Sequence, residues 1–282
     1  EITNEMLLKN LRLVEGDYLK RAAMLLFHQD PENWFFGAYV KVGFFTSPAD
    51  LLYHDDLHGP LISMADKVED VVYTKYFKGI ISYRGMQRIE TFPVPRAAFR
   101  EAVLNALIHG DHGAHNPIHI HIYPNEVLIY NSGGLPENWT ADDLFARHAS
   151  MPRNPLVAGA FFCSGQIEAW GRGIEKITSS CKEWGKPEPF YRIRPNEVMI
   201  GFKTGADAAE KILEKAGASA VQIKIIELMQ SNPKISAKAI AGEVGIAPRN
   251  VQAHIRSLKA AGLVERVGAA KGGRWRVKSD GS

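Results

Sequence analysis

The sequence of 282 residues predicts an α+β fold, a two-layer α/β sandwich in which helices cover a mixed sheet, followed by a small separate domain. Three observations lead to this prediction. Short segments of alternating apolar residues indicate strands, and segments with apolar residues about 3.6 positions apart indicate helices between them. After a polar stretch rich in Ala and Gly at 204–219, the pattern becomes helical and basic, which indicates a second domain.

The first 205 residues alternate between helical and extended patterns. Residues 1–30 are rich in helix formers, and the aromatic segment 34–45 is typical of a buried strand. Further along, the patterns predict a helix at 59–77, a strand and its return at 79–92, a helix that includes 100–111, a hairpin at 117–134, short helical pieces within 134–169, a helix at 168–185 and a last hairpin at 190–203.

Composition excludes membrane and disulfide-rich proteins. No apolar run reaches the roughly 18 residues that a bilayer requires, so no membrane partner is expected. Cys163 and Cys181 define no disulfide framework and suit a reducing compartment, so a cytoplasmic location is expected. Because the first residue is Glu1 rather than Met, we expect the chain to be a piece of a longer protein.

The charge is unevenly distributed. Residues 219–282 contain 11 Lys and Arg against 4 Asp and Glu, a net charge of +7, which leaves −4 for the rest of the chain. A basic C-terminal domain on a mildly acidic body indicates that only the C-terminal domain binds polyanions.

A row of polar side chains interrupts a helix that is otherwise apolar. Glu101, Asn105 and His109 are one helical turn apart and share one face. A solvated helix face is the ordinary explanation. Two glycine segments favour another one: "NSGG" at 131–134 ends a strand, and "WGRGIEK" at 170–176 opens a helix. Glycine lets a ligand approach the backbone, and a helix N-terminus binds phosphate, so the three features together predict a nucleotide pocket.

Four motifs occur in one order over about a hundred residues: "FPVPRAAFREAVLNALIHGD", "NSGGLPENWT", "SMPRNPLVAGAFF" and "IEAWGRGIEKI". On these motifs, residues 93–203 resemble the GHKL (Bergerat-fold) ATPases. More narrowly, they resemble the ATPase-like domain of the RecG-related, Schlafen/AlbA-associated bacterial transcriptional regulators. The resemblance implies a remnant of an AlbA-type N-terminal region and the lead-in to the ATPase-like domain at 1–92, a GHKL-like ATP-binding domain at 93–205, a linker at 206–218 and a winged helix-turn-helix at 219–282.

The resemblance also assigns roles. Glu101 matches the carboxylate that activates water for attack on the γ-phosphate, and Asn105 matches the amide that holds Mg²⁺. Segment 135–169 would be the lid over ATP. The residues expected to bind the nucleotide are Asn105, His109, Asn131, Gly133, Gly134, Arg153, Asn154, Gly171 and Gly173. For His109 a purely structural role stays equally open, and for Arg153 a helix cap or salt bridge does.

The sequence departs from the GHKL pattern at several positions. Asn131 stands where these enzymes generally have Asp for the adenine amino group, although the narrower relatives usually have Asn. Ser132 and Gly110 replace the usual Pro and Arg. No G-x-x-x-x-G-K-[ST] motif is present, so the P-loop that a helicase motor requires is absent and helicase activity is not expected.

Residues 219–282 resemble a winged helix-turn-helix. Helical patterns at 221–232, 236–245 and 247–262 precede two strands around a Gly-rich tip at 263–277. In this fold the third helix enters the major groove and the wing contacts phosphate or the minor groove. The residues expected to contact DNA are Arg249, Asn250, Gln252, Arg256, Lys271, Arg274 and Arg276. A protein-interaction role for the domain stays open. Trp275 is expected to pin the wing.

These features predict a transcriptional regulator in which an ATP-binding domain is coupled to a DNA-binding domain, with ATP, Mg²⁺ and DNA as ligands and a homodimer as the assembly. Two other classes of function stay open. One is an ATP-hydrolysing enzyme that acts on nucleic acid or a protein partner. The other is a degenerate nucleotide fold that serves as a dimerisation platform.

Overall fold

The structure is a computed structural model. It describes residues 2–47, 50–77, 79–84, 87–146, 148–168, 171–204, 220–260, 264–268 and 273–277.

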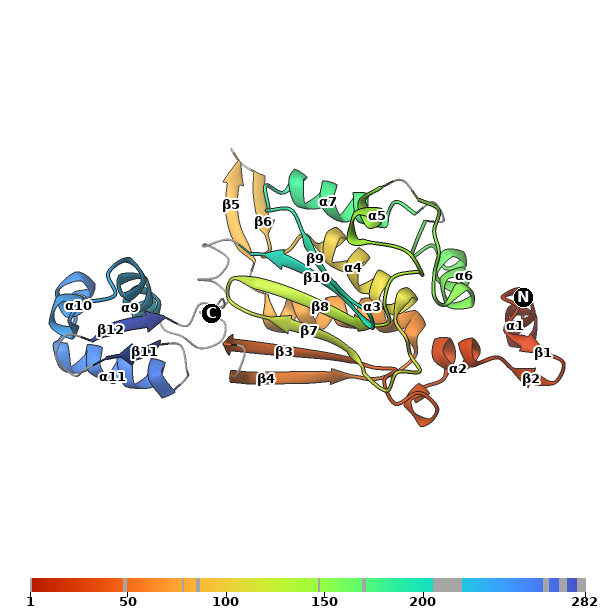
Figure 1. Cartoon of the computed structure of the whole chain (residues 1–282), viewed down its shortest axis with the longest axis horizontal. Coiled ribbons are helices and arrows are strands. Elements are labelled where there is room, and N and C mark those ends of the chain that lie inside the picture. The colour runs from red at the N-terminus through yellow and green to blue at the C-terminus, as the bar shows by residue number, and fades with distance from the viewer. Residues whose placement is uncertain are drawn as a thin grey trace.

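A six-stranded sheet organises the larger part of the molecule (Figure 1). Its strand order is β4-β3-β7-β8-β10-β9, where β3 pairs with β7 in parallel and the other neighbours are antiparallel. The strands are β3 (Val40–Ser47), β4 (Asp50–Leu57), β7 (Ile118–Ile122), β8 (Glu126–Ser132), β9 (Phe190–Arg194) and β10 (Glu197–Lys203). The predicted α+β class with a mixed sheet is therefore confirmed.

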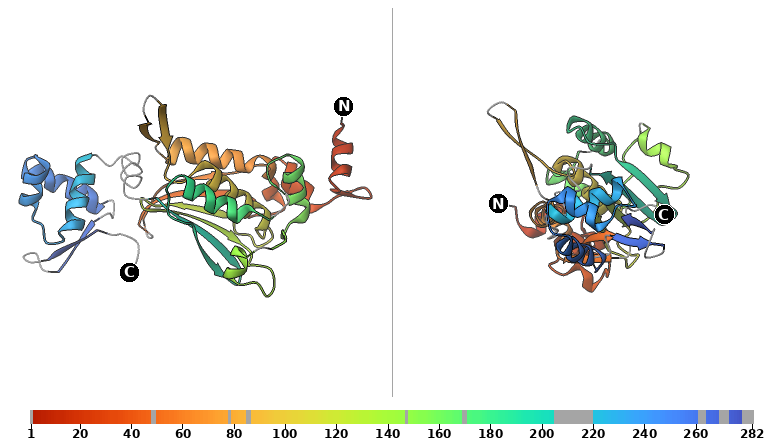
Figure 2. Two further views of the ribbon diagram at one scale, coloured as in Figure 1. Left: turned by 90° about the horizontal axis from the view of Figure 1, so that it is seen from above. Right: turned by 90° about the vertical axis from the view of Figure 1, so that its left-hand side faces the viewer.

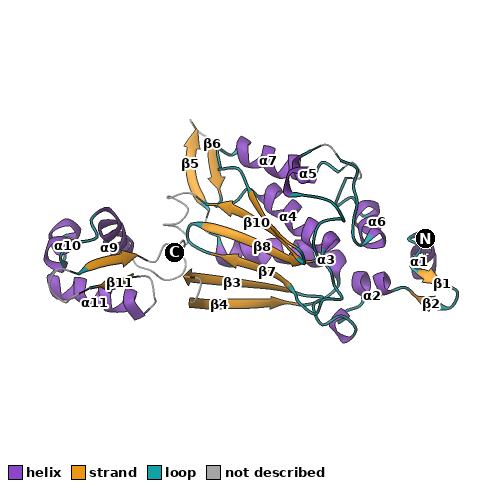
Figure 3. Ribbon diagram, in the orientation of Figure 1, coloured by secondary structure: helices purple, strands orange, loops and turns teal. Residues whose placement is uncertain are grey.

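Helices gather over one face of this sheet (Figures 2 and 3). Strand β7 shows why: Ile118, Ile120 and Ile122 are buried, whereas His119 and His121 alternate with them and lie on the other face. The helices of this part of the chain are α1 (Asn4–Asn10), α2 (Arg21–Phe27), α3 (Leu61–Val71), α4 (Arg96–His109), α5 (Ala141–Phe145), α6 (Pro155–Cys163) and α7 (Gly173–Glu183), with a 3-10 turn at Pro31–Asn33 and a π-helical turn at Val72–Tyr76. Helix α1 has no buried residues and lies beyond the end of the sheet (Figure 1).

Helix α4 lies in the core of this layer. Most of its residues are buried, including Phe99, Val103 and Leu107, and it packs against α3 on one side and α7 on the other. A helix enclosed on several sides has little room for solvated polar residues. Glu101 is nevertheless buried on it, with 7% of its surface exposed.

Two short hairpins complete the N-terminal part. Strands β1 (Val14–Glu15) and β2 (Tyr18–Leu19) pair around Gly16, whose φ of +58° suits glycine, and they interrupt the helix expected over 1–30. Strands β5 (Ile80–Arg84) and β6 (Gln87–Thr91) form a two-stranded sheet of their own, as the sequence predicts.

The predicted boundary at residue 93 does not separate two structural units. One hydrophobic core contains buried residues from Leu13 to Phe202, and β3 is hydrogen-bonded to β7 within the same sheet. Strand β4 was not predicted, and β3 begins at Val40 rather than at residue 34. Strand β4 pairs with the adjacent β3, and its sequence mixes apolar with charged residues, whereas β3 also pairs in parallel with the distant β7. Local strand patterns are weak where pairing partners stabilise a strand.

The C-terminal domain contains the predicted elements. Helices α9 (Ala220–Ser231), α10 (Ala237–Val244) and α11 (Pro248–Ala260) precede the wing strands β11 (Val264–Val267) and β12 (Arg274–Val277). The predicted caps of α10 are also present: Ser236 accepts a hydrogen bond from the Ala239 amide at 3.1 Å, and Gly245 adopts a φ of +75° after the helix. The connector at 206–218 lies outside the described residues.

Within the part of the chain that the structure describes, no helix is long and apolar enough to cross a membrane.

Candidate nucleotide pocket and DNA-binding surface

One pocket collects most of the residues predicted to bind a nucleotide. It lies between α4, the end of β8, the first turn of α7 and the segment 135–151. The predicted residues that line it are Glu101, Asn105, His109, Asn131, Gly133, Gly134, Gly171 and Gly173. The polar row of α4 therefore faces a pocket rather than open solvent.

Glu101 lies against the first turn of α7. Its Oε2 is 3.0 Å from Lys176 Nζ, and a β-carbon added to Gly173 would lie 2.7 Å from its Oε1. Glycine at position 173 is thus what allows the backbone of α7 to approach the carboxylate. The buried carboxylate of Glu101 has a cationic partner and adjoins a helix N-terminus, both of which stabilise negative charge.

Asn105 is the neighbouring group in the row. A β-carbon on Gly173 would lie 3.1 Å from Asn105 Nδ2 and 3.4 Å from Oδ1, so the amide also faces the α7 turn. Among the described residues, this half-buried amide has no hydrogen-bond partner. A partly buried amide without a partner in a pocket is suited to a polar ligand or a metal ion.

His109 ends the row. Burial lowers the pKa of His109, and the nearby Arg153 and His148 lower it further. The imidazole is therefore neutral near pH 7 and offers one donor and one acceptor to the pocket instead of a charge.

Asn131 is held at the end of β8, with 8% of its surface exposed. Its Nδ2 donates to the carbonyl of the next residue, Ser132, at 3.2 Å. None of the hydrogen bonds found among the described residues uses its Oδ1 atom, which can therefore accept one, as is expected of the residue that recognises an adenine amino group.

Glycine at positions 133 and 134 is required by the protein itself. Gly133 has a φ of +99°, and a β-carbon there would lie 2.8 Å from Arg153 Nε. A β-carbon on Gly134 would lie 2.2 Å from the carbonyl oxygen of Pro195. The "SGG" turn thus fits closely against neighbouring chain segments, and its glycines do not by themselves indicate a ligand.

Arg153 and Asn154 do not line this pocket, although both were predicted to contact phosphate. Asn154 Nδ2 donates to the carbonyls of Ile108 at 2.9 Å and Gly110 at 2.7 Å, so its side chain caps the C-terminal end of α4. Arg153 is exposed and donates to the Gly134 carbonyl at 3.2 Å. The Asn154 side chain is therefore used to cap α4, and the Arg153 side chain contacts the backbone of the glycine turn outside the pocket.

The predicted lid contributes an apolar wall. Trp139 and His148 line the pocket with their rings in edge contact, their centroids 4.7 Å apart, and Leu135, Leu144 and Met151 line it as well. Apolar and aromatic walls with a few polar groups are typical of small-molecule sites.

Two residues near Glu101 were not predicted from the sequence. Lys176 contacts Glu101 and lines a second cavity, which shares Glu101 and Gly173 with the pocket. It follows Gly173 by one helical turn, so it could have been placed beside Glu101 once α4 and α7 were paired. Tyr191 reaches the pocket from β9, and both burial and the Glu101 carboxylate raise the pKa of Tyr191. No local signal marks Tyr191, because only the sheet order brings β9 to this site.

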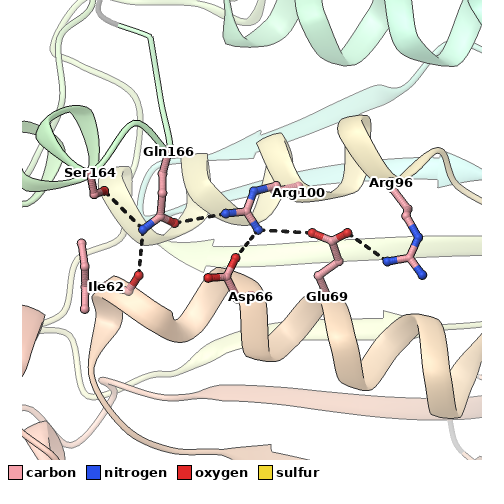
Figure 4. A network of polar contacts seen from close by, with 7 residues as sticks. All are labelled: Ile62, Asp66, Glu69, Arg96, Arg100, Ser164 and Gln166. Carbon is pink, nitrogen blue, oxygen red and sulfur yellow. Dashed lines mark hydrogen bonds and ion pairs between the residues drawn. The ribbon is translucent and has the colours of Figure 1, made fainter.

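A polar network links α4 to α3 and to the residues that follow α6 (Figure 4). Arg100, next to Glu101 in sequence, donates to Asp66 at 2.5 Å and to Glu69 at 3.2 Å on α3, and to Gln166 at 3.2 Å. Gln166 in turn donates to the Ile62 carbonyl at 2.9 Å. The network thereby joins α3, α4 and the segment that leads from α6 to Gly171.

In the C-terminal domain, all predicted DNA-contacting residues that lie within the described part of the chain are exposed. The buried side of α11 consists of Val251, Ile255 and Leu258. The predicted residues that are exposed on α11 and the wing are Arg249, Asn250, Gln252, Arg256, Arg274 and Arg276. Arg276 forms a salt bridge with Glu265 at 3.0 Å, and Lys271 lies outside the described residues.

Trp275 fixes the wing to the helices, as the sequence predicts. It is 6% exposed, and its Nε1 donates to the Ile235 carbonyl at 2.9 Å. The Arg266 guanidinium and the Lys259 ammonium lie 4.9 and 5.4 Å from its ring centroid.

Comparison with protein families identifies both domains. Residues 115–202 match the family described as "Putative ATP-dependent DNA helicase recG C-terminal", and residues 219–265 match the winged helix-turn-helix DNA-binding family. The chain therefore combines a RecG C-terminal-like, ATPase-like domain with a winged helix-turn-helix domain, as the sequence motifs predict. The first match begins after α4, so it does not include Glu101 or Asn105.

A solved structure has the same fold. The crystal structure of the DIP2311 protein from Corynebacterium diphtheriae aligns with a TM-score of 0.62 and 20% sequence identity. The alignment covers 98% of this chain and 58% of the DIP2311 chain, so this chain spans little more than half the length of that protein. The comparison with curated proteins finds no match.

Proposed function

We propose that this chain is a transcriptional regulator that binds ATP in the α4 pocket and DNA through its winged helix. The observation that carries the proposal is that one pocket contains both the polar row of α4 and the glycine segments that follow β8 and precede α7. Each feature is common by itself, but their convergence on one cavity is what a nucleotide site requires.

The pocket offers a suitable group to each part of ATP. Asn131 Oδ1 can accept from the adenine amino group, and the Trp139 and His148 rings provide an apolar wall near the lid. The first turn of α7 offers backbone amides, and its N-cap residue, Arg172, makes no side-chain cap to them. Free amides at a helix N-terminus bind phosphate oxygens.

The pocket also fits magnesium through Asn105. Mg²⁺ prefers oxygen ligands and usually retains several waters, so one amide oxygen and phosphate oxygens are a sufficient set. The half-buried Asn105 amide has no other partner among the described residues. When bound, the ion would neutralise phosphate charge.

Calorimetric titration with ATP tests this proposal. We expect the wild type to bind ATP more tightly with Mg²⁺ than without it, and Asn105→Ala to lose that difference because the amide oxygen is gone. Asn10→Ala, at an exposed position in α1, is the matched control and should behave as the wild type. The absence of any ATP binding to the wild type in Mg²⁺ would contradict the proposal and favour the dimerisation platform.

Hydrolysis is a second candidate activity, because Glu101 is a buried carboxylate beside the proposed phosphate site. A carboxylate of this kind can act as a general base toward water. Release of labelled phosphate from [γ-³²P]ATP tests it. Loss of release in Glu101→Ala with retained ATP binding would support an ATPase, and no release by the wild type would leave ATP as a ligand only.

DNA binding rests on the exposed face of α11. Arg and Asn or Gln side chains can contact base edges, and exposed wing cations can contact phosphate. One such domain contacts a short site, so a homodimer is proposed for specific binding. Fluorescence anisotropy with labelled duplexes tests the first point, using Arg249→Ala/Arg256→Ala as the impaired variant. Light scattering on the free protein tests the second, and a monomeric mass would contradict it.

A further inference from the structure

The Glu101 carboxylate occupies a position that is suited to phosphate. One oxygen contacts the Lys176 ammonium at 3.0 Å, and the other lies against Gly173 at the start of α7. A lysine together with a helix N-terminus is an ordinary anion site in proteins. In this structure a side chain of the protein provides the anion.

The two partners of this ion pair differ in their freedom. The Glu101 side chain is 9% exposed and lies on the enclosed helix α4. The Lys176 side chain is 47% exposed and has a long flexible stem. If the ion pair opens, we therefore expect the Lys176 ammonium to move to another anion and the Glu101 carboxylate to stay in place.

Arg172, the other cation at this end of the pocket, is less suited to this exchange. Its guanidinium pairs with Glu168 at 2.6 Å, and both side chains are more than half exposed. Exposed pairs of this kind contribute little. Lys176 lines the cavity that adjoins the pocket, and its partner Glu101 is buried between the two and lines both. An anion bound beside Glu101 would therefore compete with it for the Lys176 ammonium.

Resting on the proposed function, we propose that Lys176 determines specificity for triphosphates. Its ammonium exchanges Glu101 for the γ-phosphate of a nucleoside triphosphate, a group that a nucleoside diphosphate lacks. The exchange is favoured because a terminal phosphate carries more charge than a carboxylate. It also leaves Glu101 Oε2 free to accept a hydrogen bond from water.

Calorimetric Kd values for ATP and ADP in Mg²⁺ test this inference. We expect Lys176→Gln to weaken ATP binding about tenfold, the loss of one charge-assisted hydrogen bond, and to change ADP binding less than about twofold. Lys176→Arg should restore the preference for ATP. Lys182→Gln, near the C-terminal end of the same helix, is the control and should keep the wild-type ratio.

Glu101→Gln gives a second, independent measurement. It removes the competing anion, so ATP affinity should rise above that of the wild type, provided that thermal unfolding shows a folded variant. Equal weakening of ATP and ADP by Lys176→Gln, or lower ATP affinity of folded Glu101→Gln, would overturn the inference. If the wild type binds neither nucleotide, the proposed function itself fails.

Discussion

At the scale of single residues, burial decides how polar groups of this protein behave. His121 lies on the face of β7 away from the helices, between the rings of Phe45 and Tyr130 at centroid distances of 4.6 and 5.0 Å. Burial lowers the pKa of His121 to about 4, and the nearby His119 contributes to the shift. In the folded protein His121 therefore binds a proton only at a lower pH than in the unfolded chain, where the pKa of histidine is about 6.5.

This difference predicts acid sensitivity of the fold. Because the unfolded state binds the proton first, stability should fall as the pH decreases below about 6.5 and level off below about 4 for this group. His121→Phe keeps an aromatic ring between Phe45 and Tyr130 and removes the proton-binding group. We expect the unfolding midpoint of this variant to fall less than that of the wild type between pH 7 and 5.

Calorimetric unfolding at a series of pH values measures this effect. His54→Phe is the matched control, because Gly43 pairs with both His54 and His121 in the sheet, but His54 is exposed. Because His121 is still present in this control, the loss of stability attributed to His121 between pH 7 and 5 should persist. An unchanged pH dependence in His121→Phe would show that His121 carries no proton linkage.

At the scale of elements, the contact between α4 and α7 builds the pocket. Gly173 begins α7, and any β-carbon there would displace the Glu101 carboxylate and crowd the Asn105 amide. Both groups are ends of side chains rather than backbone, so the fold should tolerate a small displacement of them, whereas the site depends on their positions.

Gly173→Ala is therefore expected to keep the wild-type unfolding midpoint within a few degrees and to weaken ATP binding by about tenfold, or about 1.4 kcal/mol. Gly159→Ala is the control: this glycine lies in α6, a β-carbon there meets nothing within 4 Å, and alanine should stabilise the helix by up to about 1 kcal/mol. Unchanged ATP affinity in Gly173→Ala would mean that the α7 turn does not contact the nucleotide.

Elements with strong local patterns could be predicted from the sequence, and elements fixed by distant pairing could not. The β7–β8 hairpin, α4 and the winged helix have clear periodicity and turn signals. The parallel pairing of β3 with β7 leaves no local signal in the sequence, so the sequence does not indicate that residues 40–47 belong to the same sheet as residues 118–122. For the same reason the row on α4 was found from its spacing, whereas Tyr191 on β9 was missed and Asn154 was given a phosphate contact instead of a capping role.

At the scale of the whole molecule, the two proposed binding functions lie in domains of opposite net charge. The C-terminal domain carries the excess of positive charge, and the body that contains the pocket is mildly acidic. DNA should therefore contact the C-terminal domain alone, and its affinity should fall steeply with salt, as it does when phosphate contacts release counterions. ATP can influence DNA binding only through the protein, not through a shared surface charge.

Because the two proposed sites lie in different domains, regulation requires that ATP binding and DNA binding be thermodynamically linked. If ATP changes the affinity for DNA by some factor, DNA must change the affinity for ATP by the same factor, typically about 5- to 150-fold. Anisotropy with and without saturating Mg²⁺-ATP gives the first factor, and calorimetry with and without duplex gives the second, both at one salt concentration. Asn105→Ala should still bind DNA, and because its ATP binding lacks the gain from Mg²⁺, it should need more ATP than the wild type to produce the same change in DNA affinity. Equal DNA affinity with and without ATP in the wild type, where both ligands bind, would mean that the two domains act independently and that the chain is not a nucleotide-controlled regulator.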